Sequence, residues 1–372
     1  MKQPSIQVIG TAVPQNKISQ EIHYSILESA NGLSRGEKLR LRKIYSNSGI
    51  ASRYSVLAEF GERDNDTHIL FHPANHHAPM PVSHRMQLYE EYATSLGVEA
   101  TENCLKQLPG LKRNEITHLI TYSCTGMFAP GIDIQLTEKL DLNRNVERTC
   151  INFMGCYAAI NALKVADYIA RSQAEAVVLV VGVELCTLHY QKNDLQDQVV
   201  ANALFGDGAA ACIVSSKTFS PEKKSLNLSL QNFYSEFEPA GKDEMVWRIG
   251  DFGFDLRLSA YVPQLIKESI NQLMQKLFAR ANVKQSEIDF YAIHPGGIKI
   301  LEACEQALHI THEQNQISYN ILRDYGNMSS VTILFVLNEY LKTFSATDKG
   351  KKILACAFGP GLTMESMIVE VS

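Results

Sequence analysis

The chain has 372 residues, of which 45% are apolar and 20% charged, and its formal net charge is -5. This length predicts two domains or one duplicated core, and the ordinary composition excludes long disorder, collagen-like repeats and a coiled-coil rod. The acidic balance offers no global positive field for nucleic acid. The longest apolar run, residues 176–183, is far shorter than the roughly 20 residues of a membrane-spanning helix, and no hydrophobic signal core opens the chain. We therefore expect a soluble, cytoplasmic protein.

Apolar periodicity predicts strands and helices that alternate along the whole chain. Strands are expected at residues 6–10, 116–122, 176–183, 209–214, 288–293, 353–358 and 365–371, and helices at 85–108, 131–140, 268–281 and 331–342. The run 176–183 is apolar enough to lie in the middle of a covered sheet. This alternation indicates an α/β fold.

The chain also repeats itself. Residues 114–121 resemble residues 286–293 in polarity and spacing, and each segment leads into a Gly-containing loop and a helix. A long strand, a Gly-rich turn and a final strand occur at 177–215 and again at 353–372. Two copies of one α/β unit would place their equivalent loops on the same side of a shared core. Segments far apart in sequence could then meet at one site.

Eight cysteines are spread along the chain, and none forms a CxxC pair, which argues against zinc-finger and thioredoxin-like sites. Eight is also too few for a disulfide scaffold in a chain of this length. We expect reduced cysteines, most of them buried as small apolar side chains.

Cys156 differs from the others in its neighbours. It follows a strand-like segment and Gly155, which allows a sharp turn, and it opens an Ala- and Leu-rich stretch typical of a helix. The positive end of a helix dipole favours a thiolate at such a position. The alternative is an inert, buried cysteine at a helix start.

Two further polar residues stand at the ends of predicted elements. His294 follows the strand 288–293 and precedes a Pro-Gly-Gly loop, and Asn327 precedes the helix 331–342. By the repeat, the loop after His294 faces the same side as the strand-end loops of the first half. The alternatives are a structural histidine and a simple helix cap, for which asparagine is a preferred residue.

Together these segments resemble type III polyketide synthases, the chalcone synthase-like branch of the thiolase-fold enzymes. The motifs that carry the resemblance are Cys156, HPGG at 294–297, GNMSS at 326–330 and FGPGL at 358–362, in that order. The intervals of 138 residues from Cys156 to His294 and 33 from His294 to Asn327 agree with the family. Further similar stretches lie at 9–14, 85–91 and 203–209, so the resemblance covers nearly the whole chain.

The resemblance implies a fold and a reaction. The expected fold is a thiolase-like duplicated α/β core with αβαβα layers. Its half 1–220 would carry the nucleophile, and its half 221–372 would carry the histidine and the asparagine. Cys156 would hold the growing acyl chain as a thioester. His294 and Asn327 would stabilise the enolate formed when malonyl-coenzyme A (malonyl-CoA) loses carbon dioxide. An acyl-CoA would be the starter, and neither a metal nor a bound cofactor would be needed.

The resemblance also assigns pocket residues. Phe205 matches the family's gatekeeper phenylalanine, between the CoA tunnel and the cavity. The other expected pocket residues are Cys124, Thr125, Ala129, His189, Trp247, Leu256 and Ser329. Leu256 replaces a second gatekeeper phenylalanine of the plant enzymes, and Trp247 replaces a cavity-lining glycine. Trp247 would fill space there, while Ala129 and Leu256 would open space elsewhere. A flavonoid product is therefore not expected; a pyrone, a resorcinol or a short polyketide stays open.

CoA would bind outside this pocket. Arg40 and Lys43, in a basic cluster that by itself reads as a solvated helix face, match residues that grip CoA phosphates in the family, and Asn47 replaces a third lysine. Gly296 and Gly297 are expected to contact CoA as well. The turn at Gly359, Pro360 and Gly361 would shape the site.

Two other signals point away from further sites. His68, His72, His76, His77 and His84 cluster, but their spacing matches no familiar metal motif and the prolines among them indicate a loop. The Gly-Asp-Gly at 206–208 precedes a strand, so it is not a dinucleotide fingerprint.

Two alternatives follow from the same residues. A ketoacyl synthase III-like enzyme would use the same Cys-His-Asn set for a single extension and take malonyl groups from an acyl carrier protein. A noncatalytic thiolase-fold partner subunit typically lacks the nucleophile, which Cys156 argues against. The resemblance also implies a homodimer in which the loop around Ala129 reaches the neighbouring active site. Delivery of substrates by a carrier protein stays open.

Overall fold

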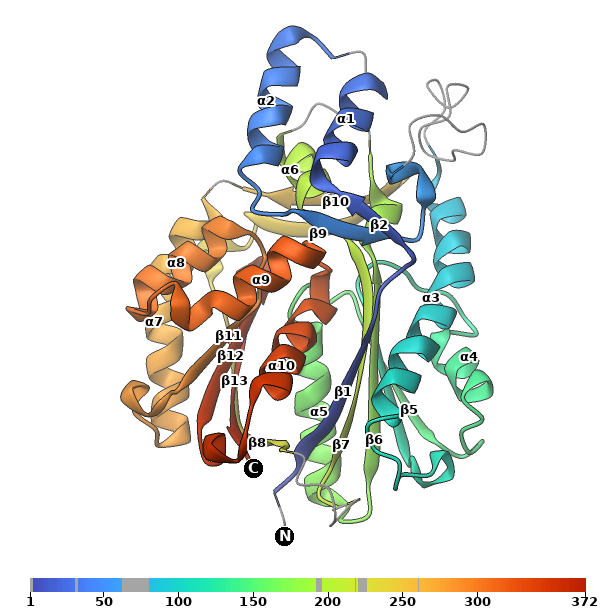
Figure 1. Cartoon of the computed structure of the whole chain (residues 1–372), viewed down its shortest axis with the longest axis vertical. Coiled ribbons are helices and arrows are strands. Elements are labelled where there is room, and N and C mark those ends of the chain that lie inside the picture. The colour runs from blue at the N-terminus through green and yellow to red at the C-terminus, as the bar shows by residue number, and fades with distance from the viewer. Residues whose placement is uncertain are drawn as a thin grey trace.

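The computed structural model describes residues 3–30, 33–61, 80–191, 196–217, 219, 226–259 and 261–372. Within these ranges, no helix is both long and apolar enough to cross a membrane. Figure 1 shows two groups of strands that stand side by side, with helices between them and on both outer faces.

A nine-stranded sheet runs through the molecule in the order β11-β12-β13-β8-β1-β7-β6-β4-β5. The first half contains β1 (Ser5–Ala12), β2 (Asn16–Ser19), α1 (Gln20–Ala30), α2 (Arg35–Ser46), β3 (Ser52–Ser55), α3 (Val82–Leu105), β4 (His118–Ser123), α4 (Ile132–Lys139), β5 (Glu147–Asn152), α5 (Ala158–Ser172), β6 (Val177–Leu185), α6 (Gln196–Leu204) and β7 (Asp207–Ser215). The second half contains β8 (Leu228–Phe237), β9 (Met245–Gly250), β10 (Gly253–Leu258), α7 (Val262–Ala281), β11 (Phe290–Ile293), α8 (Ile298–Leu308), α9 (Gln316–Tyr325), α10 (Thr332–Thr343), β12 (Lys352–Gly359) and β13 (Thr363–Val371).

Three buried apolar clusters separate five layers (Figure 1). One lies between the two halves of the sheet and is built from α5, α10 and strands of both halves. A second lies between α3 and the strands of the first half. A third lies between α7, α8 and the strands of the second half. The expected αβαβα layering is therefore confirmed.

The predicted repeat is confirmed by matching local structure in the two halves. A short 3-10 turn precedes both β4 and β11. In these turns the carboxylates of Glu115 and Glu287 accept hydrogen bonds of 2.8 and 2.7 Å from the backbone N–H groups of Lys112 and Lys284. Each strand then pairs in parallel with the first strand of an antiparallel pair, β6–β7 or β12–β13. The carboxyl ends of β4, β6, β11 and β12 consequently lie at the same end of the molecule.

Several predicted boundaries differ from the structure by a few residues; α3, for example, spans Val82–Leu105 rather than residues 85–108. Helix α7 begins at Val262 rather than at residue 268, because Pro263 falls in its first turn, where a missing N–H costs no hydrogen bond. Helix α5 begins at Ala158 rather than at Cys156. The buried run at 176–183 forms β6, all of whose residues are buried, as predicted for a strand inside a covered sheet.

Candidate active site

A pocket lies at the carboxyl ends of β4, β6 and β11, where open α/β sheets usually bind ligands. It holds about 1050 Å³ of empty space, including the space at its mouth. The hairpin of β9 and β10, which Figure 1 shows crossing above the main sheet, contributes part of the wall. The pocket brings together these predicted site residues: Cys124, Thr125, Cys156, His189, Phe205, Trp247, Leu256, His294, Gly296, Asn327, Ser329 and Pro360.

Cys156 lies in the tight turn between β5 and α5. Its Sγ is 3.7 Å from the Ser329 hydroxyl, and the N–H of Gly155 donates a 2.9 Å hydrogen bond to the Cys124 sulfur. Burial raises the pKa of the Cys156 thiol to about 12. The expected lowering of this pKa by the helix is thus outweighed by desolvation, since α5 begins two residues later.

Gly155 is required at this turn for two reasons. Its φ is +85°, and a Cβ placed there would lie 2.1 Å from Cδ of Pro360. The strand turn at residues 359–361 therefore packs directly on the turn that holds the cysteine, and a side chain would push them apart.

We expect Gly155→Ala to cost about 1–3 kcal/mol in unfolding free energy through backbone strain and to lower kcat/KM roughly 10²-fold by displacing Cys156. Gly350→Ala is the matched control, because Gly350 has φ +87° but no atom within 4 Å of the added Cβ. Denaturant unfolding and steady-state kinetics measure both variants. Equal activity of the Gly155 variant and the control would contradict this role.

His294 ends β11 on the pocket wall. Its side chain is 1% exposed, and both ring nitrogens lack a hydrogen-bond partner among the described residues. Burial lowers the pKa of His294 to about 3, so its imidazole is neutral and available for proton or hydrogen-bond exchange with a bound molecule. An orphaned, buried imidazole beside a cysteine in a pocket is a strong indication of a functional role.

Asn327 is positioned through its backbone. Its N–H donates to Leu204 O at 2.9 Å and its carbonyl accepts from Gly206 N at 3.0 Å, so it forms a bridge with Phe205. Its Oδ1 accepts from Ser329 N at 2.9 Å, which closes a local turn rather than the helix cap considered as an alternative, since the N-cap of α10 is Val331; its Nδ2 lies 3.3 Å from Gly296 O. The backbone segments of Phe205 and Asn327 are therefore joined directly.

An aromatic wall closes one side of the pocket. Trp247 donates its indole N–H to Cys124 O at 2.8 Å, and the His189 ring stacks on Phe254 with centroids 3.9 Å apart. His189 is held at both nitrogens, by Thr125 O at 2.6 Å and by Phe254 N at 3.1 Å, and burial lowers its pKa to about 3. Trp247 faces Leu256 across the β9–β10 hairpin. The predicted space-filling by Trp247 agrees with this wall.

Glu184 is a residue that the sequence analysis missed. It is the penultimate residue of β6 and has no exposed surface. Its carboxylate accepts hydrogen bonds from Cys124 N at 3.0 Å, the Thr125 hydroxyl at 2.8 Å and the Ser330 hydroxyl. Burial raises the pKa of Glu184, and these donors oppose that shift. The sequence does contain a signal for this residue, a single acidic side chain directly after the apolar run 176–183.

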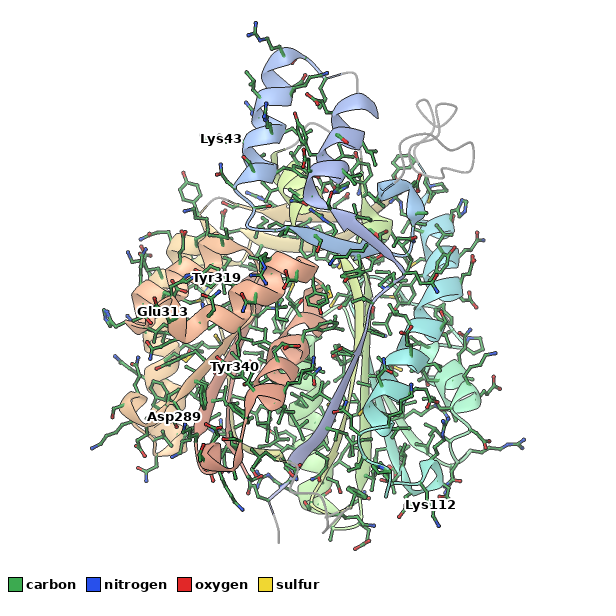
Figure 2. All side chains as sticks on the ribbon, in the orientation of Figure 1. Lys43, Lys112, Asp289, Glu313, Tyr319 and Tyr340 are labelled. Atoms are coloured by element: carbon green, nitrogen blue, oxygen red, sulfur yellow. The ribbon has the colours of Figure 1, made fainter. Side chains whose placement is uncertain are left out.

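Several predicted residues lie outside the pocket. Ala129 is exposed on the loop between β4 and α4, so it does not open space in its own chain's pocket, which corrects that expectation. Arg40 and Lys43 are exposed on α2; Lys43 is labelled in Figure 2. Gly297 precedes α8 with φ +156°. The remaining residues of the strand turn, Gly359 and Gly361, flank the lining residue Pro360.

Across the described ranges, no three histidine, cysteine or carboxylate side chains form a group that could hold a metal ion. His68, His72, His76 and His77 lie outside the described residues. His84 is exposed near the start of α3.

Comparison with known proteins identifies relatives along the whole chain. Residues 3–218 match the N-terminal domain of chalcone and stilbene synthases, and residues 228–372 match their C-terminal domain. The chain is 30% identical to the alpha-pyrone synthesis polyketide synthase-like Pks18 of Mycobacterium tuberculosis, over 91% of this chain and 84% of that protein. It is 28% identical to type III polyketide synthase C of Arabidopsis thaliana, over 98% and 94%. The crystal structure of PKS-I from the brown alga Ectocarpus siliculosus superposes with a TM-score of 0.92 at 29% identity, over 100% of this chain and 99% of that one.

Proposed function

Because the chain belongs to the chalcone and stilbene synthase family, the type III polyketide synthases, we propose that Cys156 loads an acyl-CoA starter and that malonyl-CoA extends it. The observation that carries this proposal is the meeting of Cys156, His294 and Asn327 in one pocket, from segments of both halves of the chain. The family makes the protein an enzyme of the acyltransferase class, so the noncatalytic alternative is wrong.

The reaction follows from the side chains. The Cys156 sulfur attacks the starter's thioester carbonyl, and CoA leaves as the thiol after taking up the cysteine's proton. Malonyl-CoA then loses carbon dioxide, and the electrons of the broken C–C bond pass into an enolate. The enolate carbon attacks the acyl-cysteine carbonyl, the C–S bond to Cys156 breaks, and the extended chain leaves on CoA. An imidazole N–H of His294 and Nδ2 of Asn327 are the donors for the oxyanions. No metal or bound cofactor enters these steps.

Because the pKa of Cys156 is raised, its thiol can react at neutral pH only if a neighbouring group accepts its proton. Alone, a thiol with a pKa of about 12 stays protonated at neutral pH, and the neutral His294 is the group on the pocket wall that can accept its proton. A thiolate and an imidazolium formed together attract each other strongly in a pocket poor in water.

We therefore expect His294→Ala to slow iodoacetamide alkylation of Cys156 on the order of 10²-fold at pH 7. The difference in alkylation rate between the wild type and His294→Ala should decrease as the pH approaches about 12, where the thiol ionises without a base. Cys150 lies on β5 outside the pocket and serves as the internal control, because its alkylation rate should be the same in the two proteins whether or not the proposed dimer covers it. Mass spectrometry of peptides reads both sites. Equal rates at Cys156 in the two proteins at pH 7 would exclude His294 as the base.

The product class is proposed from the pocket and the relatives. The name of the Mycobacterium tuberculosis relative refers to alpha-pyrone synthesis, and the wall of Trp247, His189 and Phe254 limits the space in which a long intermediate could fold. A pyrone, a resorcinol or a short polyketide fits this pocket better than a large aromatic scaffold does.

The test of the proposed function is product analysis by mass spectrometry. Purified protein is mixed with malonyl-CoA and acyl-CoA starters from short to long and aromatic, with Cys156→Ala as the control. Products extended by several units and absent from the control support the proposal. A single extension, or extension only when malonyl groups are supplied on an acyl carrier protein, would support the ketoacyl synthase alternative instead.

We also propose that the protein acts in the cytoplasm, because the reaction needs access to CoA thioesters.

We also propose that the protein is a homodimer joined along β5. This strand is the edge of the nine-stranded sheet, and five of its six residues are exposed. Met127 (40% exposed) and Ala129 are exposed on the loop after the neighbouring β4. An uncovered edge strand beside exposed apolar side chains is a natural contact for a second copy. Light scattering after size-exclusion chromatography should give twice the chain mass, and a monomer at all concentrations would refute the dimer.

A further inference from the structure

A buried histidine on α1 lines the same pocket and has no part in the proposed reaction. The side chain of His23 is 2% exposed, and its Nε2 has no hydrogen-bond partner among the described residues. Its Nδ1 lies 3.4 Å from the Tyr45 hydroxyl. A buried polar atom without a partner costs free energy unless a ligand supplies the missing bond.

The surroundings of His23 keep its ring neutral. Burial lowers its pKa well below the usual value, and the positive charge of Arg53 acts in the same direction. The ring packs edge-on against Phe60, with centroids 5.1 Å apart, and against Tyr45, with centroids 5.5 Å apart. In the tautomer in which the Tyr45 hydroxyl donates to Nδ1, Nε2 carries the hydrogen, and the ring then presents one uncharged N–H donor to the pocket.

The rest of the pocket directs a bound chain toward this donor. On one side, Trp247 and His189 are fixed by hydrogen bonds and form a rigid wall. On the side of α1, the lining residues Cys186, Thr187 and Ala201 are small. Phe60 connects this side to the site, because its ring also contacts Tyr190, at 5.7 Å between centroids, beyond the end of β6.

We propose that the pocket selects a starter acyl chain bearing an uncharged oxygen, a hydroxyl or a ketone, at the end away from the thioester, and that His23 Nε2–H binds this oxygen. The inference rests on the proposed function, since it names the substrate class of the same pocket. A carboxylate at that end would bind less well, because it would lose its hydration beside the rings of Phe60 and Tyr45 while the donors of the nearby Arg53 guanidinium are already taken by backbone carbonyls and the Gln20 side chain.

The test measures binding without turnover. The protein is Cys156→Ala, and the readout is the fluorescence of Trp247, the single tryptophan of the chain, which stands in the pocket wall. Acyl-CoAs of increasing length are compared in matched sets with a terminal methyl, hydroxyl or carboxyl group. At the length that reaches His23, we expect the hydroxyl compound to bind about 3- to 10-fold more tightly than the methyl compound.

Variants at His23 decide the assignment. His23→Phe keeps a ring but removes the donor, so the hydroxyl preference should disappear while binding of the methyl compound is retained. His23→Gln keeps an N–H donor and should retain part of the preference. His84→Phe is the control, since His84 is exposed outside the pocket. A preference that survives in His23→Phe, equal binding of methyl and hydroxyl compounds at every length, or a preference for the carboxyl compound overturns the inference. Product formation by the wild-type protein is measured separately, so loss of the hydroxyl preference while products form leaves the proposed function intact.

Discussion

Replacing Cys156 with alanine should abolish product formation, with a loss of roughly 10³-fold or more in kcat, because no other group on the pocket wall can carry the acyl chain as a thioester in its place. Cys124 and Cys186 also line the pocket, but both are buried whereas Cys156 is partly exposed, and the Cys124 sulfur is already held by the backbone N–H and carbonyl of Gly155. Neither can replace a missing nucleophile.

Intact-protein mass spectrometry after incubation with starter acyl-CoA alone gives the direct measurement. The wild-type chain should gain the mass of one acyl group, and Cys156→Ala should gain none. Cys150→Ala is the matched control, because Cys150 is exposed outside the pocket, and it should be acylated like the wild type. Acylation of the Cys156→Ala variant would show that another residue is the nucleophile.

Replacing Arg53 with methionine should lower the unfolding free energy by about 3–5 kcal/mol, because several buried backbone carbonyls would lose their hydrogen-bond donor at about 1–3 kcal/mol each. Arg53 is 1% exposed, and it donates hydrogen bonds to backbone carbonyls in the last turn of α6. Its guanidinium donates to Asn202 O at 2.7 Å and to Phe205 O at 2.8 Å, and also to Ala203 O and the Gln20 side chain. These carbonyls have no helical partners of their own. Burial lowers the pKa of Arg53 to about 10, so it stays charged at neutral pH.

The same substitution should lower activity, because Arg53 holds carbonyls in the last turn of α6 and the carbonyl of Phe205, which follows α6 and forms the bridge with Asn327. Arg53→Lys keeps the charge but reaches fewer acceptors, and it should fall between the wild type and methionine. Arg144→Met, on the surface, should change stability by less than about 0.5 kcal/mol. Denaturant unfolding and kcat/KM measure all three variants. Wild-type stability in Arg53→Met would show that water replaces the guanidinium.

The local pattern of side chains was enough to predict much of the fold. The apolar run that became β6 and the helical spacing that became α3 depend on which face of one element is buried, and this is encoded in neighbouring residues. The repeat was visible because the same turn precedes β4 and β11. Cys156, His294 and Asn327 could be named because the motifs around them resemble a family whose chemistry needs a nucleophile and two donors.

Other features depend on contacts between segments that are far apart in the chain. Cys156 and Ser329 are 173 positions apart, and the wall of Trp247, His189 and Phe254 joins β9, β10 and the turn after β6. The roles of Glu184 and His23 appear only when their hydrogen-bond partners, or the lack of them, are known. Burial decided the protonation of Cys156 against the helix dipole expected from its position. The spacing of apolar residues along a helix or strand does not reveal these features, because desolvation and hydrogen bonding depend on how whole layers pack against one another.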